Sequence, residues 1–155
     1  MNARYDCFCK LSDLFGAQES LSEARRHLHR FPELSFQEKS TAQWVGDQLE
    51  SWGYHVTRNV GGYGLVATLK NGEGKGIALR ADMDALPILE TNDVPYKSKN
   101  PGVMHACGHD VHTASLLGTA HILQQVRGEF EGTIKLLFQP AEEKAPEIGR
   151  ASCRE

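Results

Sequence analysis

The chain has 155 residues, enough for one modest domain with a hydrophobic core, and its 40% apolar and 24% charged content is ordinary for a soluble globular protein. Its 17 basic and 20 acidic residues give a net charge of -3, so no electrostatic feature favours a nucleic acid as partner. No apolar run is long enough to span a membrane, and we expect no secretory signal. The four cysteines are scattered, which argues against a disulfide framework and favours a cytoplasmic, reducing setting.

Hydrophobic periodicity predicts two helices near the N-terminus. Residues 18–30 carry an apolar stripe at helical spacing, with serines at the start that can cap the helix and a Phe-Pro pair after it. Ser35 and Glu38 then form a capping box, with Ser35 as N-cap and Glu38 three residues on. We therefore expect a second helix, which Gly53 ends.

The period of the apolar pattern then changes to two. Residues 54–58 and 64–69 are predicted strands separated by a glycine turn, and the short apolar runs 77–81 and 133–138 suit buried strands. A third predicted helix, 111–126, lies between those two runs. Helices alternating with strands in this way predict an α/β layer architecture.

The motif MHACGHD, at the start of the third predicted helix, contains the first chemical signal. Cys107 and His109 are two residues apart, and on extended backbone that spacing points both side chains the same way. A thiolate and an imidazole that converge suit zinc or a similar divalent metal. Gly108 allows the backbone to turn between them. Asp110 could cap the helix or orient an imidazole from behind.

Two carboxylate motifs follow predicted buried strands. Glu142 and Glu143 are adjacent and face opposite ways on extended chain, so that one can bind a metal while the other reaches an attacking water. Asp82 and Asp84 share one face, from which they could support an imidazole ligand or the catalytic loop.

Each signal also has an ordinary structural explanation. A lone cysteine is more often a small buried hydrophobe, a Glu-Glu pair is usually solvated, and an aspartate at a strand end often caps a turn. We interpret His27 and His29 as structural or surface residues and His121 as a helix-face residue, and we leave the roles of His105 and His112 open. The convergence of three motifs on one chemistry favours a functional site.

Four sequence blocks carry a family resemblance: RRHLHRFPELSFQE, ALRADMDALPI, PGVMHACGHDVHTASLLGTA and GTIKLLFQPAEE. In this order they resemble the N-terminal half of the peptidase-related, metal-dependent amidohydrolases, which include hippurate hydrolase, N-acyl-L-amino acid amidohydrolases and plant auxin-conjugate hydrolases. The resemblance covers about residues 20–144. It implies the N-terminal part of a zinc-exopeptidase-like catalytic domain, a mixed sheet flanked by helices, with a smaller lid or dimerisation domain inserted in the longer protein.

The resemblance also implies the roles of individual residues. Cys107, His109 and Glu143 would be metal ligands and Glu142 the general base. Asp82, Asp84 and Asp110 remain candidates for supporting these residues because of their positions in the sequence. Two divalent ions (Zn, Mn, Co or Ni) would serve the reaction, which splits an N-acyl amino acid into a carboxylic acid and a free amino acid. The parent protein would take no nucleic-acid or membrane partner and could be a homo-oligomer.

The chain departs from the family in its length. Family members are much longer, and two further histidine ligands come later in them, so we expect these 155 residues to be inactive alone. We assign residues 1–17 to an N-terminal extension and 18–146 to the catalytic domain. Residues 147–155 can be encoded by a string resembling a common sequencing adapter, and we expect this tail to be non-native.

Two other functions could use the same residues. A non-catalytic metal-binding or dimerisation module of the same fold would keep Cys107 and His109 but would have no use for Glu142. A cysteine hydrolase would use Cys107 as nucleophile, but the two-residue spacing to His109 suits a shared metal better than proton transfer.

Overall fold

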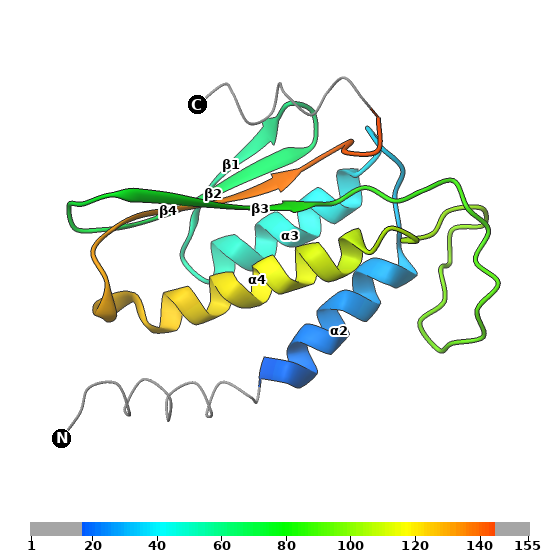
Figure 1. Ribbon diagram of the computed structural model, residues 1–155, viewed down its shortest axis with the longest axis horizontal. Coiled ribbons are helices and arrows are strands. Elements are labelled where there is room, and N and C mark those ends of the chain that lie inside the picture. Colours follow the sequence, from blue (N-terminus) through cyan, green and yellow to red (C-terminus); the bar gives the residue numbers. More distant parts are fainter. Residues whose placement is uncertain (1–16, 145–155) are drawn as a thin grey trace.

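A computed structural model describes residues 17–144 (Figure 1). The expected N-terminal extension, apart from Ala17, and the expected non-native tail lie outside these residues and are not tested. In chain order the elements are α2 (Ala17–Arg30), α3 (Lys39–Ser51), β1 (His55–Val60), β2 (Gly64–Asn71), β3 (Gly76–Asp82), α4 (His109–Gln125), the 3-10 helix η2 (Arg127–Glu129) and β4 (Gly132–Gln139). The three helices and four strands predicted from the sequence are therefore all present.

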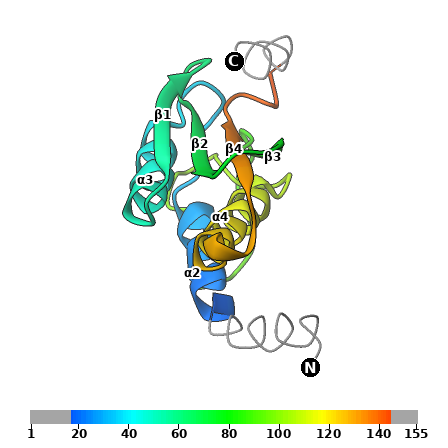
Figure 2. The same ribbon diagram turned by 90° about the vertical axis from the view of Figure 1, so that its left-hand side faces the viewer.

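The four strands form one mixed sheet in the order β1-β2-β4-β3, which Figure 2 shows edge-on. β2 runs antiparallel to both β1 and β4, whereas β3 runs parallel to β4. Helix α4 connects the parallel pair, as a crossover connection requires. Because parallel strands end at the same edge, the residues that follow β3 and β4 are brought together: Asp82 pairs with Gln139.

The helices lie together on one face of the sheet (Figures 1 and 2). The core between the two layers contains side chains that are almost fully buried, among them Val45 and Leu49 of α3, Leu117 of α4, and Leu136 and Phe138 of β4. No helix among the described residues is long and apolar enough to cross a membrane. The α/β expectation, a mixed sheet with flanking helices, is confirmed.

The prediction that Ser35 and Glu38 form a capping box at the second helix is wrong. Helix α3 begins at Lys39 with Glu38 as its N-cap, and the Glu38 side chain makes no capping hydrogen bond to the helix. The carboxylate of Glu33 instead accepts hydrogen bonds from the backbone N–H groups of Ser40 and Thr41, at 3.1 and 2.8 Å. The reason is tertiary: the side chains of Ser35 and Glu38 are buried and bond to distant loops, described below.

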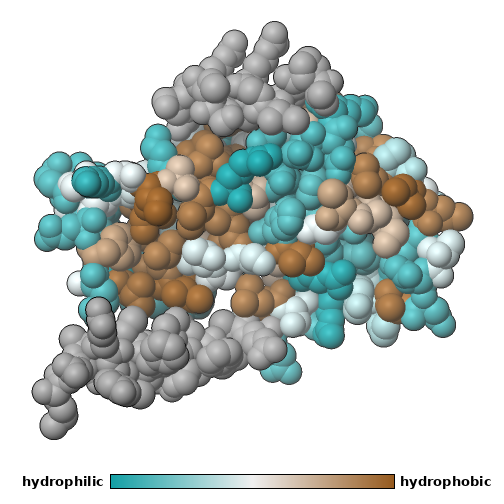
Figure 3. Space-filling model, viewed as in Figure 1, coloured by the Kyte–Doolittle hydropathy of each residue, from teal (hydrophilic) through white to brown (hydrophobic). Residues whose placement is uncertain are grey.

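The expectation of a buried strand at 77–81 is only partly correct. β3 is one of the two edge strands of the described sheet, and Ile77 is 58% exposed, whereas Ala81 and Asp82 at its end are buried. Apolar surface is visible in the left half of Figure 3, inward of the hydrophilic tip at the far left. A short apolar run does not reveal how many neighbours its strand has, and here β3 pairs with β4 alone among the described strands.

Candidate metal centre

The three predicted motifs meet at the edge of the sheet where β3 and β4 end and α4 begins, on the right in Figure 1. The ALRADMDALPI block supplies the end of β3, the HACGHD block the start of α4, and the QPAEE block the end of β4. The N–H of Met83 donates to the carbonyl of Gln139 at 3.0 Å, which ties the two strand ends together. Residues that are distant in the sequence thus surround one point.

His109 lies at the centre of this cluster. Gly108 precedes it with a φ of 91°, a left-handed conformation that glycine adopts without strain, and His109 is the first residue of α4. Its Nδ1 donates to the backbone carbonyl of Asp84 at 2.9 Å, which leaves Nε2 as the free ring nitrogen. That Nε2 lies 3.8 Å from a carboxylate oxygen of Glu142, 3.8 Å from one of Glu143 and 3.9 Å from one of Asp82.

Cys107 completes one group of ligand atoms. A thiol sulfur, an imidazole nitrogen and a carboxylate oxygen from Cys107, His109 and Glu143 lie within 4.8 Å of one another. A second group, Asp82, His109 and His112, meets the same criterion and shares the central imidazole. Cys107 is exposed, and His109 is buried, so the cluster opens to solvent on its sulfur side.

The charges around His109 determine its protonation. Burial lowers the pKa of His109, but hydrogen bonds to Asp84 and the charges of Asp82 and Asp84 outweigh burial and raise the pKa to about 9. Burial raises the pKa of Asp84, yet hydrogen bonds from His109, Ser35 and the amides of residues 142 and 143 bring it down to about 2. Asp84 is therefore an ionised anchor for the imidazole.

The donor set fits a divalent cation. Hydrogen bonding to the Glu143 carboxylate, followed by burial and by surrounding negative charge, raises the pKa of the Cys107 thiol. Oxygen Oε1 of Glu143 is buried and has no hydrogen-bond partner among the described residues. A divalent cation would neutralise the clustered carboxylates and satisfy the buried oxygen. The neighbouring thiol and imidazole would complete a mixed set of S, N and O ligands.

Comparison with known proteins identifies the family. The model of Peptidase family M20/M25/M40 matches residues 78–154. The chain is 54% identical over 123 residues to the N-acyl-L-amino acid amidohydrolase of Geobacillus stearothermophilus, covering 79% of this chain and 33% of that protein. It is 46% identical over 134 residues to the hippurate hydrolase of Campylobacter jejuni, covering 86% of this chain and 34% of that protein. The chain belongs to peptidase family M20/M25/M40.

A solved structure agrees with this assignment. The Bacillus subtilis YXEP protein, described as a dinuclear metal binding peptidase of the M20 family, superposes with a TM-score of 0.77 at 46% identity, covering 81% of this chain and 35% of that one. Human carnosine dipeptidase 1 shares the fold alone, with a TM-score of 0.67 at 13% identity. The resemblance drawn from the four blocks is confirmed. The chain spans about a third of the length of the curated relatives that it matches.

The supporting aspartates of this M20 chain have different partners. Asp84 accepts hydrogen bonds from the Ser35 hydroxyl at 2.7 Å and from the N–H of Glu143 at 3.0 Å, in addition to contacting His109. Asp82 forms an ion pair with Arg80 and lies 3.6 Å from Nδ1 of His112, whose side chain is half exposed. His112 is therefore placed at the rim of the cluster.

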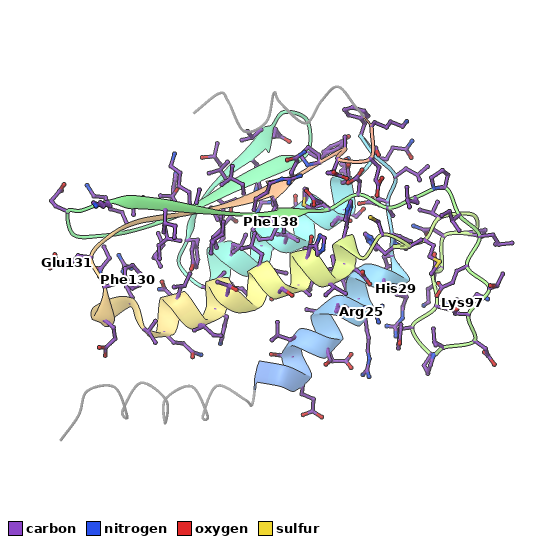
Figure 4. The ribbon with its side chains drawn as sticks, viewed as in Figure 1. Arg25, His29, Lys97, Phe130, Glu131 and Phe138 are labelled. Atoms are coloured by element: carbon purple, nitrogen blue, oxygen red, sulfur yellow. The ribbon has the colours of Figure 1, made fainter. Side chains whose placement is uncertain are left out.

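Asp110 orients an imidazole, but it is that of His29. Oδ2 of Asp110 lies 2.8 Å from Nδ1 of His29, and Nε2 of His29 lies 3.0 Å from Glu90 on the loop after β3. Arg25, one helical turn before His29, also pairs with Asp110 at 2.8 Å, and Figure 4 shows both labelled side chains at the end of α2 beside the start of α4. His29 is thus a structural residue and not a surface one.

Sequence reasoning missed Ser35, Glu38 and Glu90 as neighbours of the site. Their partners are 49, 103 and 61 positions away, so no local spacing signals them. His105 is also buried, with neither ring nitrogen hydrogen-bonded among the described residues, and burial lowers its pKa to about 4. It is therefore a neutral imidazole near His109 and Asp84.

Proposed function

We propose that the protein carrying this chain hydrolyses the amide bond of N-acyl amino acids with the help of divalent cations. The observation that carries the proposal is the convergence of Cys107, His109 and Glu143 on one point, with Glu142 beside them. The similarity to an N-acyl-L-amino acid amidohydrolase and to a hippurate hydrolase supports this choice of substrate class.

In this proposal Cys107, His109 and Glu143 hold the cation. Nδ1 of His109 is engaged by Asp84, so Nε2 is the nitrogen presented to the ion, and Asp84 keeps the ring in that orientation. A bound divalent cation would supply Lewis-acid polarisation of the scissile carbonyl and would lower the pKa of a water. A dinuclear centre, as named for the YXEP protein, built from Zn, Mn, Co or Ni suits these ligands.

Glu142 acts as the general base. Its carboxylate lies 3.8 Å from Nε2 of His109, and its side chain is 31% exposed, so it faces both the ligand cluster and the space that a substrate would enter. It takes a proton from the attacking water as the carbon–oxygen bond forms, and it returns that proton to the nitrogen as the carbon–nitrogen bond breaks. The products are a carboxylic acid and a free amino acid.

The environment of Cys107 supports a metal ligand over a nucleophile. Glu143 raises the pKa of the thiol, which disfavours the free thiolate that a cysteine hydrolase requires. A module that only binds metal would gain nothing from Glu142. We further propose that the protein is cytoplasmic. These 155 residues alone should bind metal weakly and hydrolyse substrate poorly, because the resemblance assigns further histidine ligands to later parts of longer relatives.

The test uses the protein encoded by the complete gene. Metal content is measured together with hydrolysis of a panel of N-acyl amino acids. We expect Glu142→Gln to keep its metal and to lose about 100-fold to 10,000-fold in kcat, because the amide cannot accept the proton. Cys107→Ala should lose metal and activity together. Full activity after exhaustive chelation, or a fully active Glu142→Gln variant, would refute the proposal.

A further inference from the structure

The segment 31–38 contacts the loops of the candidate metal centre, although the proposed chemistry assigns it no part. It is anchored to the strand-end loop through the N–H of Ala85, which donates to the Glu33 carbonyl at 2.8 Å. From this segment two buried side chains reach the loops of the site: Ser35 donates to Asp84, and Glu38 reaches the loop that follows β4. The segment therefore contacts two of the three motifs that form the cluster.

Glu38 makes the longest-range of these contacts. Its side chain is fully buried, and its Oε1 accepts a hydrogen bond from the N–H of Ala141 at 2.8 Å, across 103 positions of sequence. A buried carboxylate is costly unless it is hydrogen-bonded, so its retention here needs a reason. Burial, the largest cause, raises the pKa of Glu38, so the surroundings disfavour its charged form, whereas the hydrogen bond to Ala141 requires only an acceptor oxygen within reach.

The contact falls where the backbone turns toward the cluster. Ala141 has a φ of 54°, a left-handed conformation that residues with a side chain rarely adopt, and it directly precedes Glu142 and Glu143. The N–H of Glu143 is held in turn by Asp84 at 3.0 Å. Two buried carboxylates thus hold the amides on either side of Glu142, and this tethering directs both glutamate side chains toward Nε2 of His109.

We infer that Glu38 is a positioning residue for the metal centre: by accepting the Ala141 N–H it holds the turn that presents Glu142 and Glu143. This inference rests on the proposed function, since it assumes that Glu143 is a ligand. It predicts that the length of the side chain at position 38, and not its charge, governs metal affinity.

The test titrates the protein encoded by the complete gene with Co²⁺, following the thiolate-to-cobalt absorption band as a direct report of binding beside Cys107. Glu38→Asp keeps the charge but draws the carboxylate back from Ala141, and we expect Co²⁺ affinity to fall about 10-fold to 100-fold. Glu38→Gln keeps the reach and an acceptor oxygen, and we expect an affinity close to that of the wild type, with the same band.

Glu33→Asp is the matched control. It shortens a carboxylate in the same segment, but one that bonds to the start of α3 and not to the site, so it should lower the melting temperature while leaving Co²⁺ affinity unchanged. The inference would be overturned if Glu38→Asp bound Co²⁺ as tightly as the wild type. It would also be overturned if Glu38→Gln or Glu33→Asp lost as much Co²⁺ affinity as Glu38→Asp. Absence of the band in the wild-type protein from the complete gene would instead overturn the proposed metal site itself.

Discussion

His29 illustrates how a single residue acquires its role from partners on other elements. Its two ring nitrogens face carboxylates of Asp110 and Glu90, and all three side chains are almost fully buried. Each ring nitrogen lies within hydrogen-bond distance of a different carboxylate, so the ring links two buried acidic side chains. This one side chain therefore joins α2, the start of α4 and the loop after β3, immediately behind His109.

Tyr54 is a residue whose ionisation opposes folding. Its hydroxyl donates to the carbonyl of Ala120 at 2.8 Å, and burial raises its pKa from 10.0 to about 12. A raised pKa means that the contribution to stability is complete below pH 10 and is lost as the pH rises to 12. We expect the wild type to lose about 2 to 3 kcal/mol across this window through Tyr54.

The measurement is urea unfolding at several pH values between about 8 and 12, on wild type and on Tyr54→Phe. The variant lacks the hydrogen bond, so it should be less stable at about pH 8 by about 1 kcal/mol, but its stability should fall less steeply above about pH 10. Parallel pH profiles for the two proteins would contradict the assignment of this window to Tyr54.

At the scale of elements, the helix layer depends on close contact between α2 and α4. Gly118 lies in the middle of α4 and is buried against α2. A Cβ placed on Gly118 would overlap Cδ2 of Leu21 and would lie 3.1 Å from its Cγ, closer than non-bonded carbons usually approach. The glycine therefore sets how closely the two helices pack, although glycine inside a helix costs about 1 kcal/mol relative to alanine.

Gly118→Ala tests which of these effects is larger. Overpacking of this kind costs about 1 to 3 kcal/mol, so we expect a net loss of about 1 kcal/mol despite the better helix propensity of alanine. Truncation by Leu21→Ala removes the clash, and the double variant should be more stable than the sum of the single effects implies. Denaturant unfolding of the four proteins measures the coupling. A Gly118→Ala variant more stable than the wild type would show that α2 shifts at little cost to accommodate the added methyl group.

At the scale of the whole molecule, the site is built where the ends of several elements meet. The parallel pairing of β3 with β4 brings two carboxylate motifs to one edge, and α4 starts at that edge with His109. The segment before α3 bonds to the loops of the cluster through Ser35 and Glu38. A cation bound at this junction would therefore contact loops that follow two strands and precede one helix, and it would resist their separation on unfolding.

We accordingly expect Co²⁺ to stabilise the folded chain. At a free concentration of about 100 times Kd the gain is about 2.7 kcal/mol, which for a domain of this size raises Tm by about 5 to 10 °C. Thermal unfolding with and without Co²⁺ measures the shift. Cys107→Ala should show a much smaller shift, whereas Cys153→Ala, which alters a cysteine outside the proposed ligands, should shift as the wild type does. Equal shifts in both variants would place the cation elsewhere.

Features that depend on local order could be predicted from the amino-acid sequence alone. Apolar spacing was sufficient for the helices α2, α3 and α4 and for the four strands, because periodicity reflects which face of one element is buried. The two-residue spacing of Cys107 and His109 and the adjacent Glu142 and Glu143 likewise pointed to side chains that do meet around one point.

The partners of the buried polar side chains, in contrast, depend on the tertiary structure. Ser35 and Glu38 match a local capping pattern, yet they bond to Asp84 and to Ala141, and His29 pairs with a carboxylate 81 positions away. The outer position of β3 in the described sheet was also beyond prediction from its apolar run. Such partners escape prediction because a hydrogen bond depends on distance in space, and chain topology brings together residues whose separation in sequence carries no periodic signal.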